Sequence, residues 1–282
     1  MTEIVIRAIT DAAGCTAVEQ LQIDAWQLTD MVEVVPCHML LTFHKNGGAL
    51  LGAYADERLV GFVAGFVGLM ANGRFKHASH MMGIHPDFQG QGIGTRLKLA
   101  QRQMVRQQGL NLITWTYDPL ETANARLNIH KLGAVCRTYI PNLYGEIKGI
   151  NAGLPTDRFQ VDWHINSQHV EDRLAGKNGE ETAVPAHLIL NPVAGNGRPP
   201  ETTQSPSEAR HFVQIPTNIR ALKARTCPWR WPGSNTLASS WPSFLPKITP
   251  SPICLAARAN FSFIENVAER PQNRPITIIC NR

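Results

Sequence analysis

The most informative segment of the sequence is rich in glycine and lies between an apolar run and an amphipathic one. Gln89, Gly90, Gly92 and Gly94 belong to this segment, and the apolar run before it ends at Ile84. Glycines at a strand-to-helix junction let backbone N–H groups converge, and the first turn of a helix adds unpaired donors and the positive end of a dipole. The segment therefore predicts an anion site, most naturally for a pyrophosphate, with a ligand-free glycine turn as the alternative.

Two other phosphate-binding loops are excluded by their residue requirements. A Walker loop needs a lysine after its final glycine, whereas Gly94 is followed by Thr95 and Arg96. A dinucleotide-binding fingerprint needs a third glycine where Leu97 stands. It also needs an acid about 20 residues further on, for which Asp118 lies slightly too far along the chain.

An alternating pattern of strands and helices in residues 1–165 must position this segment. The expected strands, which are apolar runs between turn signals, are 4–9, 49–54, 59–67, 75–84, 110–117, 135–140 and 159–165. The expected helices are one capped by Asp11 and three more at 36–44, 92–108 and 121–132. In the helix 92–108, Lys98 and Arg102 lie off the apolar stripe. The pattern predicts an α/β protein of the α+β type with a mixed sheet.

The motif Gln89-x-x-Gly92-x-Gly94, preceded by Ile84-His85-Pro86, resembles the acyl-CoA-binding motif of the GNAT superfamily of N-acyltransferases. The order of elements in residues 1–165 also resembles the GNAT fold, in which the central sheet is splayed. Residues 114–133 are similar to one bacterial subgroup of predicted acetyltransferases. The resemblance implies an enzyme that transfers acetyl, or a larger acyl group, from acetyl-CoA or another acyl-CoA to an amine of a small molecule or peptide.

The resemblance also implies which residues bind the co-substrate. The backbone amides of the loop would hold the CoA pyrophosphate, and they belong to Gln89, Gly90, Gln91, Gly92, Ile93, Gly94 and Thr95. Backbone groups near Met82 and Ile84 would bind the pantetheine and polarise the thioester carbonyl. Asn124, and Asn128 one turn later, would reach the pantetheine arm, with a solvated amide on the helix surface as the alternative.

His80 is the residue we expect to act as the catalytic base. Strand alternation places Ala78, His80, Met82 and Ile84 on one face and His77 on the other. Because Met82 and Ile84 lie along the CoA arm in the family pattern, His80 would point toward the reacting centre. An ordinary pKa near 6.5 suits a base at neutral pH. A packed or substrate-contacting histidine is the alternative.

The sequence departs from the family pattern at one position. Many members carry a tyrosine that protonates the leaving thiolate, and Ile129 stands at that position here. No general acid can therefore be assigned by resemblance. Tyr144 is a possible substitute, although a structural aromatic is the simpler interpretation. The ten histidines are scattered, so the sequence predicts no metal site.

Cysteine usage and hydropathy point to a reduced, cytoplasmic protein. The six cysteines form no C-x-x-C pair and predict no disulfide framework or zinc site. No apolar run is long enough to span a membrane, and the first residues show no secretory signal. The stretch 30–46, which would cover the acceptor cleft in this fold, is rich in apolar residues and suggests a partly apolar acceptor.

The last 59 residues differ in composition from the rest of the chain. Residues 224–282 contain seven of the 27 Lys and Arg but two of the 22 acids, so residues 1–223 are neutral in formal charge. They also contain eight of the 19 prolines and no Asp. We expect a GNAT domain at 1–165, a linker with a short element at 166–223, and an irregular tail at 224–282. The tail is expected to be poorly ordered or to be translated out of frame.

Two other function classes remain open. A GNAT-like module could bind acyl-CoA without catalysis, which the missing tyrosine favours and the intact glycine motif disfavours. The hypothesis of a nucleic-acid-binding protein depends only on the basic tail. The neutral residues 1–223 show no basic face with interleaved aromatics. We therefore expect an amine acceptor as partner, no nucleic acid and no membrane. A homodimer is left open.

Overall fold

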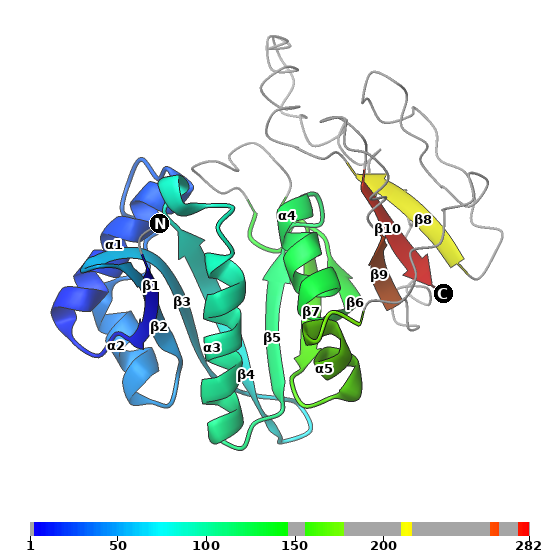
Figure 1. Ribbon diagram of the computed structural model, residues 1–282, viewed down its shortest axis with the longest axis horizontal. Coiled ribbons are helices and arrows are strands. Elements are labelled where there is room, and N and C mark those ends of the chain that lie inside the picture. The colour runs from blue at the N-terminus through cyan, green and yellow to red at the C-terminus, as the bar shows by residue number, and fades with distance from the viewer. Residues whose placement is uncertain (1–2, 146–155, 178–209, 216–259, 265–275, 282) are drawn as a thin grey trace, which may run out of the picture. The chain divides into compact units, whose positions relative to one another are not determined.

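The computed structural model describes residues 3–145, 156–177, 210–215, 260–264 and 276–281 (Figure 1). The chain divides into two compact units. The first consists of Met1–Trp115, Lys148–Ala152 and Asp162–Ser167, and the second of Thr116–Ile147, Gly153–Val161 and Gln168–Arg282. Among the described residues, no helix has the length and apolar character needed to cross a membrane.

The first unit is built on an antiparallel run of strands that ends in one parallel pair. Its strands are β1 (Ile4–Ala8), β2 (Leu50–Ala55), β3 (Arg58–Leu69) and β4 (Phe75–Ile84), and they pair in this order. The next neighbour is β5 (Leu112–Tyr117), which runs parallel to β4. This mixture of antiparallel and parallel pairing confirms the mixed sheet expected from the sequence.

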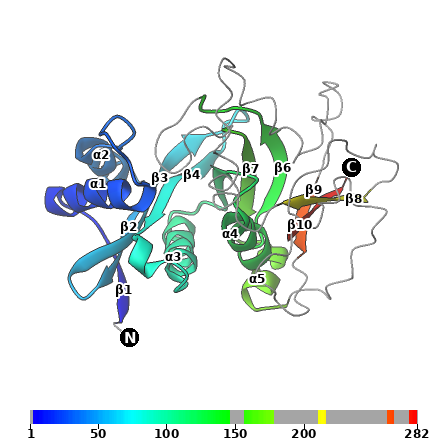
Figure 2. The ribbon, with the colours of Figure 1, turned by 90° about the horizontal axis from the view of Figure 1, so that it is seen from above.

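Helices cover both faces of this sheet (Figure 2). On one face lie α1 (Ala12–Trp26) and α2 (Cys37–Lys45), and on the other lies α3 (Ile93–Gln107). Asp11 caps α1 as expected, because its Oδ1 accepts a hydrogen bond of 2.7 Å from the amide of Gly14. A short 3-10 turn, η1 (Pro86–Phe88), joins β4 to the glycine loop before α3.

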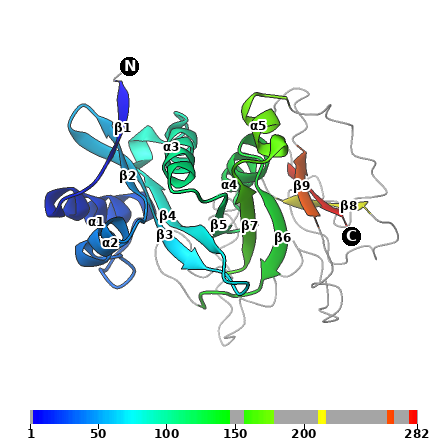
Figure 3. The same cartoon turned by 90° about the horizontal axis from the view of Figure 1, so that it is seen from below.

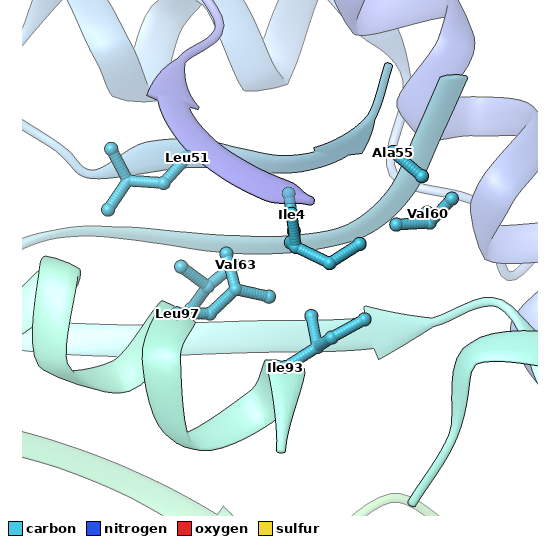
Figure 4. Close-up of a cluster of buried hydrophobic side chains, with 8 residues drawn as sticks. Ile4, Leu51, Ala55, Val60, Val63, Ile93 and Leu97 are labelled. Carbon is cyan, nitrogen blue, oxygen red and sulfur yellow. The ribbon is translucent and has the colours of Figure 1, made fainter. Parts of the chain in front are cut away.

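Two apolar clusters fix these helices on the sheet. The α1 and α2 side chains pack with Leu50 and Phe62 on one face. On the other face, Ile93 and Leu97 of α3 pack against the strands, as Figure 4 shows for Ile4, Leu51, Ala55, Val60 and Val63. Burial of these side chains supplies most of the free energy that holds α3, and thereby the loop before it, against β4.

The second unit continues from the end of β5. Its strand order is β5, β7 (Arg158–His164), β6 (Val135–Ile140), β9 (Asn260–Ile264), β10 (Ile276–Asn281) and β8 (Arg210–Ile215). Its helical segments are α4 (Thr122–Ala125), η2 (Arg126–Lys131) and α5 (Gln168–Leu174), which Figure 3 shows from the opposite side to Figure 2.

Two sequence predictions in this unit are corrected by the structure. The helix expected at 121–132 is a single α-helical turn, α4, followed by η2, which is a π-helix. Part of the expected linker at 166–223 forms α5, whose Val170 is buried. The strands β9 and β10 are the described parts of the tail at 224–282. Its other positions, on which the expectation of poor order or a shifted frame depends, lie outside the described residues.

Candidate functional site

The glycine loop adopts the left-handed conformations that its glycines permit. Gly90 has φ 77° and Gly92, the N-cap of α3, has φ 78°. A Cβ atom at either position would meet nothing within 4 Å, so backbone conformation and not crowding selects glycine here. Because Gly92 has no side chain, α3 begins without a side-chain cap. The first amides of α3 therefore keep their donors for an external acceptor.

Side chains of the loop bond back to its own backbone and hold its shape. Gln89 Nε2 donates to Ile84 O at 3.2 Å, and Gln91 Nε2 donates to Asp87 O at 3.3 Å. Both glutamine side chains are thus used to brace the loop. This use of the two side chains is compatible with the prediction that the segment binds a pyrophosphate through its backbone amides.

Arg58 is a further contributor that the sequence did not indicate. Its Nη2 lies 2.9 Å from Nε2 of His85, and its guanidinium lies 5.5 Å from the ring centre of Phe88. The arginine thus places a positive charge beside the turn that leads into the loop. Arg58 begins β3, and 27 residues separate it from His85, so no local sequence pattern could have revealed this contact.

The edge of β4 that faces β5 is paired only near its start. The two parallel strands pair at His77 with Ile113 and at Ala78 with Thr114. From Ser79 to Ile84, no described strand other than β3 pairs with β4. Met82 and Ile84, the predicted pantetheine-binding positions, lie in this stretch, so among the described residues no strand occupies this edge of β4.

A β-bulge in β4 corrects the expected facing of His80. Ala64 of β3 pairs with Met81, and Gly65 pairs with Ser79, so His80 is an extra residue on β4. The alternation of side chains therefore changes phase at His80. The prediction that His80 shares a face with Met82 and Ile84 is wrong.

The phase change separates the two histidines of β4. His77 and Ser79 face α3, as Met82 and Ile84 do, because they bond to α3 side chains or pack in its cluster. His80 instead lies on the face of α2. His77 and His80 therefore do lie on opposite faces, as the sequence predicted, but each is on the face expected of the other.

His80 lies in an aromatic environment. Its ring centre is 6.2 Å from that of Phe43 on α2 and 6.2 Å from that of Phe66 on β3. No described residue forms a hydrogen bond with its ring nitrogens. Desolvation by these neighbours lowers the pKa of His80 below its ordinary value, although part of the residue remains exposed. At neutral pH the imidazole is therefore neutral and can accept a proton.

Lys98 is buried, contrary to its expected position off the apolar stripe of α3. Only 3% of the residue is exposed. Its Nζ donates to Ser79 Oγ at 2.8 Å and to Gln101 Oε1 at 3.3 Å, and it lies 3.9 Å from the ring centre of Trp115 on β5. Burial lowers the pKa of Lys98 to about 7.

The hydrogen-bond network around Lys98 extends to His77. Ser79 Oγ donates to Gln101 Oε1 at 3.0 Å, and Gln101 Nε2 lies 3.1 Å from His77 Nε2. Burial, with a smaller contribution from the charge of Lys98, lowers the pKa of His77 to about 4. His77 is therefore neutral near pH 7. No carboxylate among the described residues pairs with Lys98.

Lys98 is expected to make stability depend on pH. The folded pKa of about 7 lies below the unfolded value of 10.5, so the unfolded chain binds more protons between these values. The cost of burying the charge is present in full below pH 7 and declines as the pH rises. Between pH 7 and 9 we expect the free energy of unfolding to rise by about 2 kcal/mol.

Lys98→Met serves as the matched comparison for that prediction. The methionine carries no titratable group, so most of this rise should disappear in the variant. Urea unfolding of both proteins at pH 7 and pH 9 measures the difference. Parallel pH dependences in the two proteins would contradict a buried, pH-dependent charge at Lys98.

The remaining predicted site residues belong to the second unit. Asn124 is half-buried in α4, and Asn128 is buried in η2. The alternative interpretation of Asn128 as a solvated amide on the helix surface is therefore wrong. The π-helix places Asn128 on a wider turn than an α-helix would. Their role toward CoA stays a prediction.

Tyr144, the substitute considered for a general acid, already has partners. Its hydroxyl lies 3.0 Å from Thr116 Oγ1, and the guanidinium of Arg158 lies 5.2 Å from its ring centre. These contacts favour the interpretation of Tyr144 as a structural aromatic. In the part of the chain that the structure describes, no group of three or more His, Cys, Asp or Glu could hold a metal ion.

Solved structures of two acetyltransferases are similar to part of this chain. The yncA protein from Salmonella typhimurium, solved with its cofactor acetyl-CoA, is 18% identical with a TM-score of 0.47 and covers 58% of this chain and 95% of its own. The ribosomal-protein-S18-alanine N-acetyltransferase from Escherichia coli is 13% identical with a TM-score of 0.46 and covers 58% and 96%. None of the curated proteins compared matches the sequence.

The family assignment depends on the sequence match and not on these structural similarities. The matching family model is that of the Acetyltransferase (GNAT) family, and the match begins within α1, includes the glycine loop and ends after η2. Residues 15–133 of the chain match the model of this family.

Proposed function

We propose that the protein is an acyl-CoA-dependent N-acyltransferase, most simply an N-acetyltransferase that uses acetyl-CoA. The observation that carries the proposal is the continuity of two features on β4. The strand edge that is open from Ser79 onward leads directly to the uncapped N-terminus of α3. An extended arm with a terminal pyrophosphate matches a strand edge followed by a cluster of free amides.

The proposed binding mode assigns each part of CoA to residues of the chain. The amides of residues 90–95 hold the pyrophosphate, whereas the amide of Gln89, also predicted to do so, already donates to Pro86 O at 3.2 Å. The charge of Arg58 beside the loop adds attraction for phosphate. Backbone groups of Met82 and Ile84 bind the pantetheine and the thioester carbonyl. Asn124 and Asn128 are assigned to the pantetheine arm on the family resemblance alone.

The proposed reaction is direct attack of an amine on the thioester. The amine must lose a proton to become nucleophilic, and neutral His80 accepts that proton. The carbonyl oxygen gains negative charge as the C–N bond forms, and amides of β4 stabilise it. The C–S bond then breaks and CoA leaves.

The surface beside His80 suggests an acceptor with an apolar group near its amine. Phe66 of β3, which contacts His80, is 37% exposed and packs against Phe43 with ring centres 5.1 Å apart. Exposed apolar side chains beside a reactive histidine favour an apolar small molecule or peptide as the partner. The absence of a disulfide pattern in the sequence supports a cytoplasmic setting.

A turnover assay tests the proposal against the non-catalytic alternative. Release of free CoA thiol from acetyl-CoA would be followed with a panel of apolar and polar amines, and CoA binding would be measured by calorimetry. Amine-dependent release of CoA is expected. Binding without release from any amine would favour a non-catalytic acyl-CoA-binding module, and the absence of CoA binding would refute both.

A further inference from the structure

An ammonium group lies where the two parallel strands separate. The last paired residues of β4 and β5 are Ala78 and Thr114, and the next residues along are Ser79 and Trp115. Lys98 Nζ contacts both of these next residues, at 2.8 Å from Ser79 Oγ and 3.9 Å from the Trp115 ring centre. The lysine thus bridges the strands at the start of the open edge of β4.

A buried lysine without a carboxylate partner is costly, so its presence needs a reason. The groups that face it from β4 and α3 are neutral: the hydroxyl of Ser79, the amide of Gln101 and, beyond that amide, neutral His77. From β5 the Trp115 ring contacts it. The site therefore offers positive charge and a proton to an anion that arrives at the open edge.

Thioester aminolysis produces such an anion. When the C–S bond breaks, the electron pair goes to sulfur, and the resulting thiolate is stabilised by a proton donor. The position where the family pattern supplies a tyrosine is Ile129, and the hydroxyl of Tyr144 is already bonded to Thr116. The proposed reaction therefore still lacks an assigned acid.

We propose that Lys98 is that acid and that it protonates the departing CoA sulfur through the hydroxyl of Ser79. The inference depends on the proposed function of the same site. Ser79 Oγ accepts a hydrogen bond from Lys98 Nζ and turns its own proton from Gln101 Oε1 to the sulfur. As it gives that proton away, it takes one from the ammonium.

The proton balance of the step closes without a further reactant. An acceptor that arrives as an ammonium first loses one proton through His80 to solvent. As the neutral amine then attacks, the C–N bond forms, the C–S bond breaks, and His80 takes the second proton from the nitrogen. Lys98 is left neutral, and CoA leaves as the thiol. Proton exchange with solvent then restores both residues. A pKa of about 7 leaves a substantial fraction of Lys98 both charged and ready to release its proton at neutral pH.

The test compares two acetyl thioesters in the variants Lys98→Met and Ser79→Ala. Acetyl-CoA has a basic thiolate as its leaving group, whereas the acetyl thioester of a nitrothiophenol releases a stable thiolate that needs no acid. We expect kcat/KM for acetyl-CoA to fall about 10²-fold in each variant. The value for the aryl thioester should stay within about threefold of wild type, because only the acid is lost.

The pH profile gives an independent readout. In wild type, kcat with acetyl-CoA should fall as the pH rises above about 7, because Lys98 loses its proton. This fall should be absent in Lys98→Met. Lys76→Met, a substitution of the same type elsewhere on β4, is the matched control and should retain the wild-type profile.

Each outcome decides for or against the proposal. Selective loss with acetyl-CoA and disappearance of the alkaline fall would support it. Equal losses with both thioesters, or an unchanged pH profile in Lys98→Met, would overturn it and leave Lys98 a structural residue. No turnover of either thioester by wild type would instead overturn the proposed function, and the acid role with it.

Discussion

His80→Ala is expected to lower kcat at saturating acetyl-CoA about 10²-fold while leaving CoA affinity nearly unchanged. The bulge removes His80 from the regular ladder and points it toward Phe43 and Phe66, on the face opposite α3. An amine that arrives on that face meets a neutral imidazole whose ring nitrogens have no partner among the described residues. Loss of the base should slow proton removal, while the glycine loop proposed to bind the pyrophosphate remains intact.

The pH dependence distinguishes this base from a packing residue. Because desolvation lowers the pKa of His80, the neutral form that accepts a proton predominates from a lower pH than in an ordinary histidine. The rate should rise with pH as this form accumulates in wild type and lose this rise in the variant. Steady-state kinetics from pH 5 to 7 would measure it.

His164→Ala provides the control for His80→Ala. His164 is an exposed histidine of β7, outside the proposed machinery, and its replacement should leave both the rate and the pH profile unchanged. A loss of less than about threefold in His80→Ala, with an unshifted pH profile, would reassign His80 to packing or substrate contact.

The sequence predicted the parts of the site that depend on local chain properties. The glycine loop, the apolar stripe of α3 and the hairpin of β2 and β3 each follow from residue type and spacing within one short segment. Gly90 and Gly92 both have positive φ, which glycine adopts readily. Local signals therefore located the glycine loop between β4 and α3, and its binding of phosphate stays a prediction.

The features that the sequence did not predict depend on pairing between distant segments. The bulge at His80 exists only relative to the register of β3, and strand alternation within β4 cannot reveal it. A lysine that lies off the apolar stripe of an amphipathic helix is usually solvated. The burial of Lys98 follows from the close approach of Ser79 and Trp115 to α3. The π-helix η2 likewise depends on a hydrogen-bond pattern that composition does not mark.

Gly92→Glu is expected to weaken CoA binding about 10²-fold. The residue is the N-cap of α3, and a Cβ there would meet open space, so the new side chain can lie over the first amides of the helix. Its carboxylate would occupy the donors proposed for the pyrophosphate and would repel its charge. A 10²-fold loss corresponds to about 2.7 kcal/mol of binding free energy, which calorimetry with CoA can measure.

Gly109→Glu is the matched control because it reproduces every feature of that substitution except its place at the loop. Gly109 follows the other end of α3, has φ 74° and also has open space around a would-be Cβ. The backbone strain of the two variants should therefore be similar. The helix dipole should favour the carboxylate at position 92 and disfavour it at 109, so Gly92→Glu should be the more stable variant. Weaker CoA binding in that more stable variant alone would locate the phosphate site at the loop, whereas equal affinities in the two variants would refute this assignment.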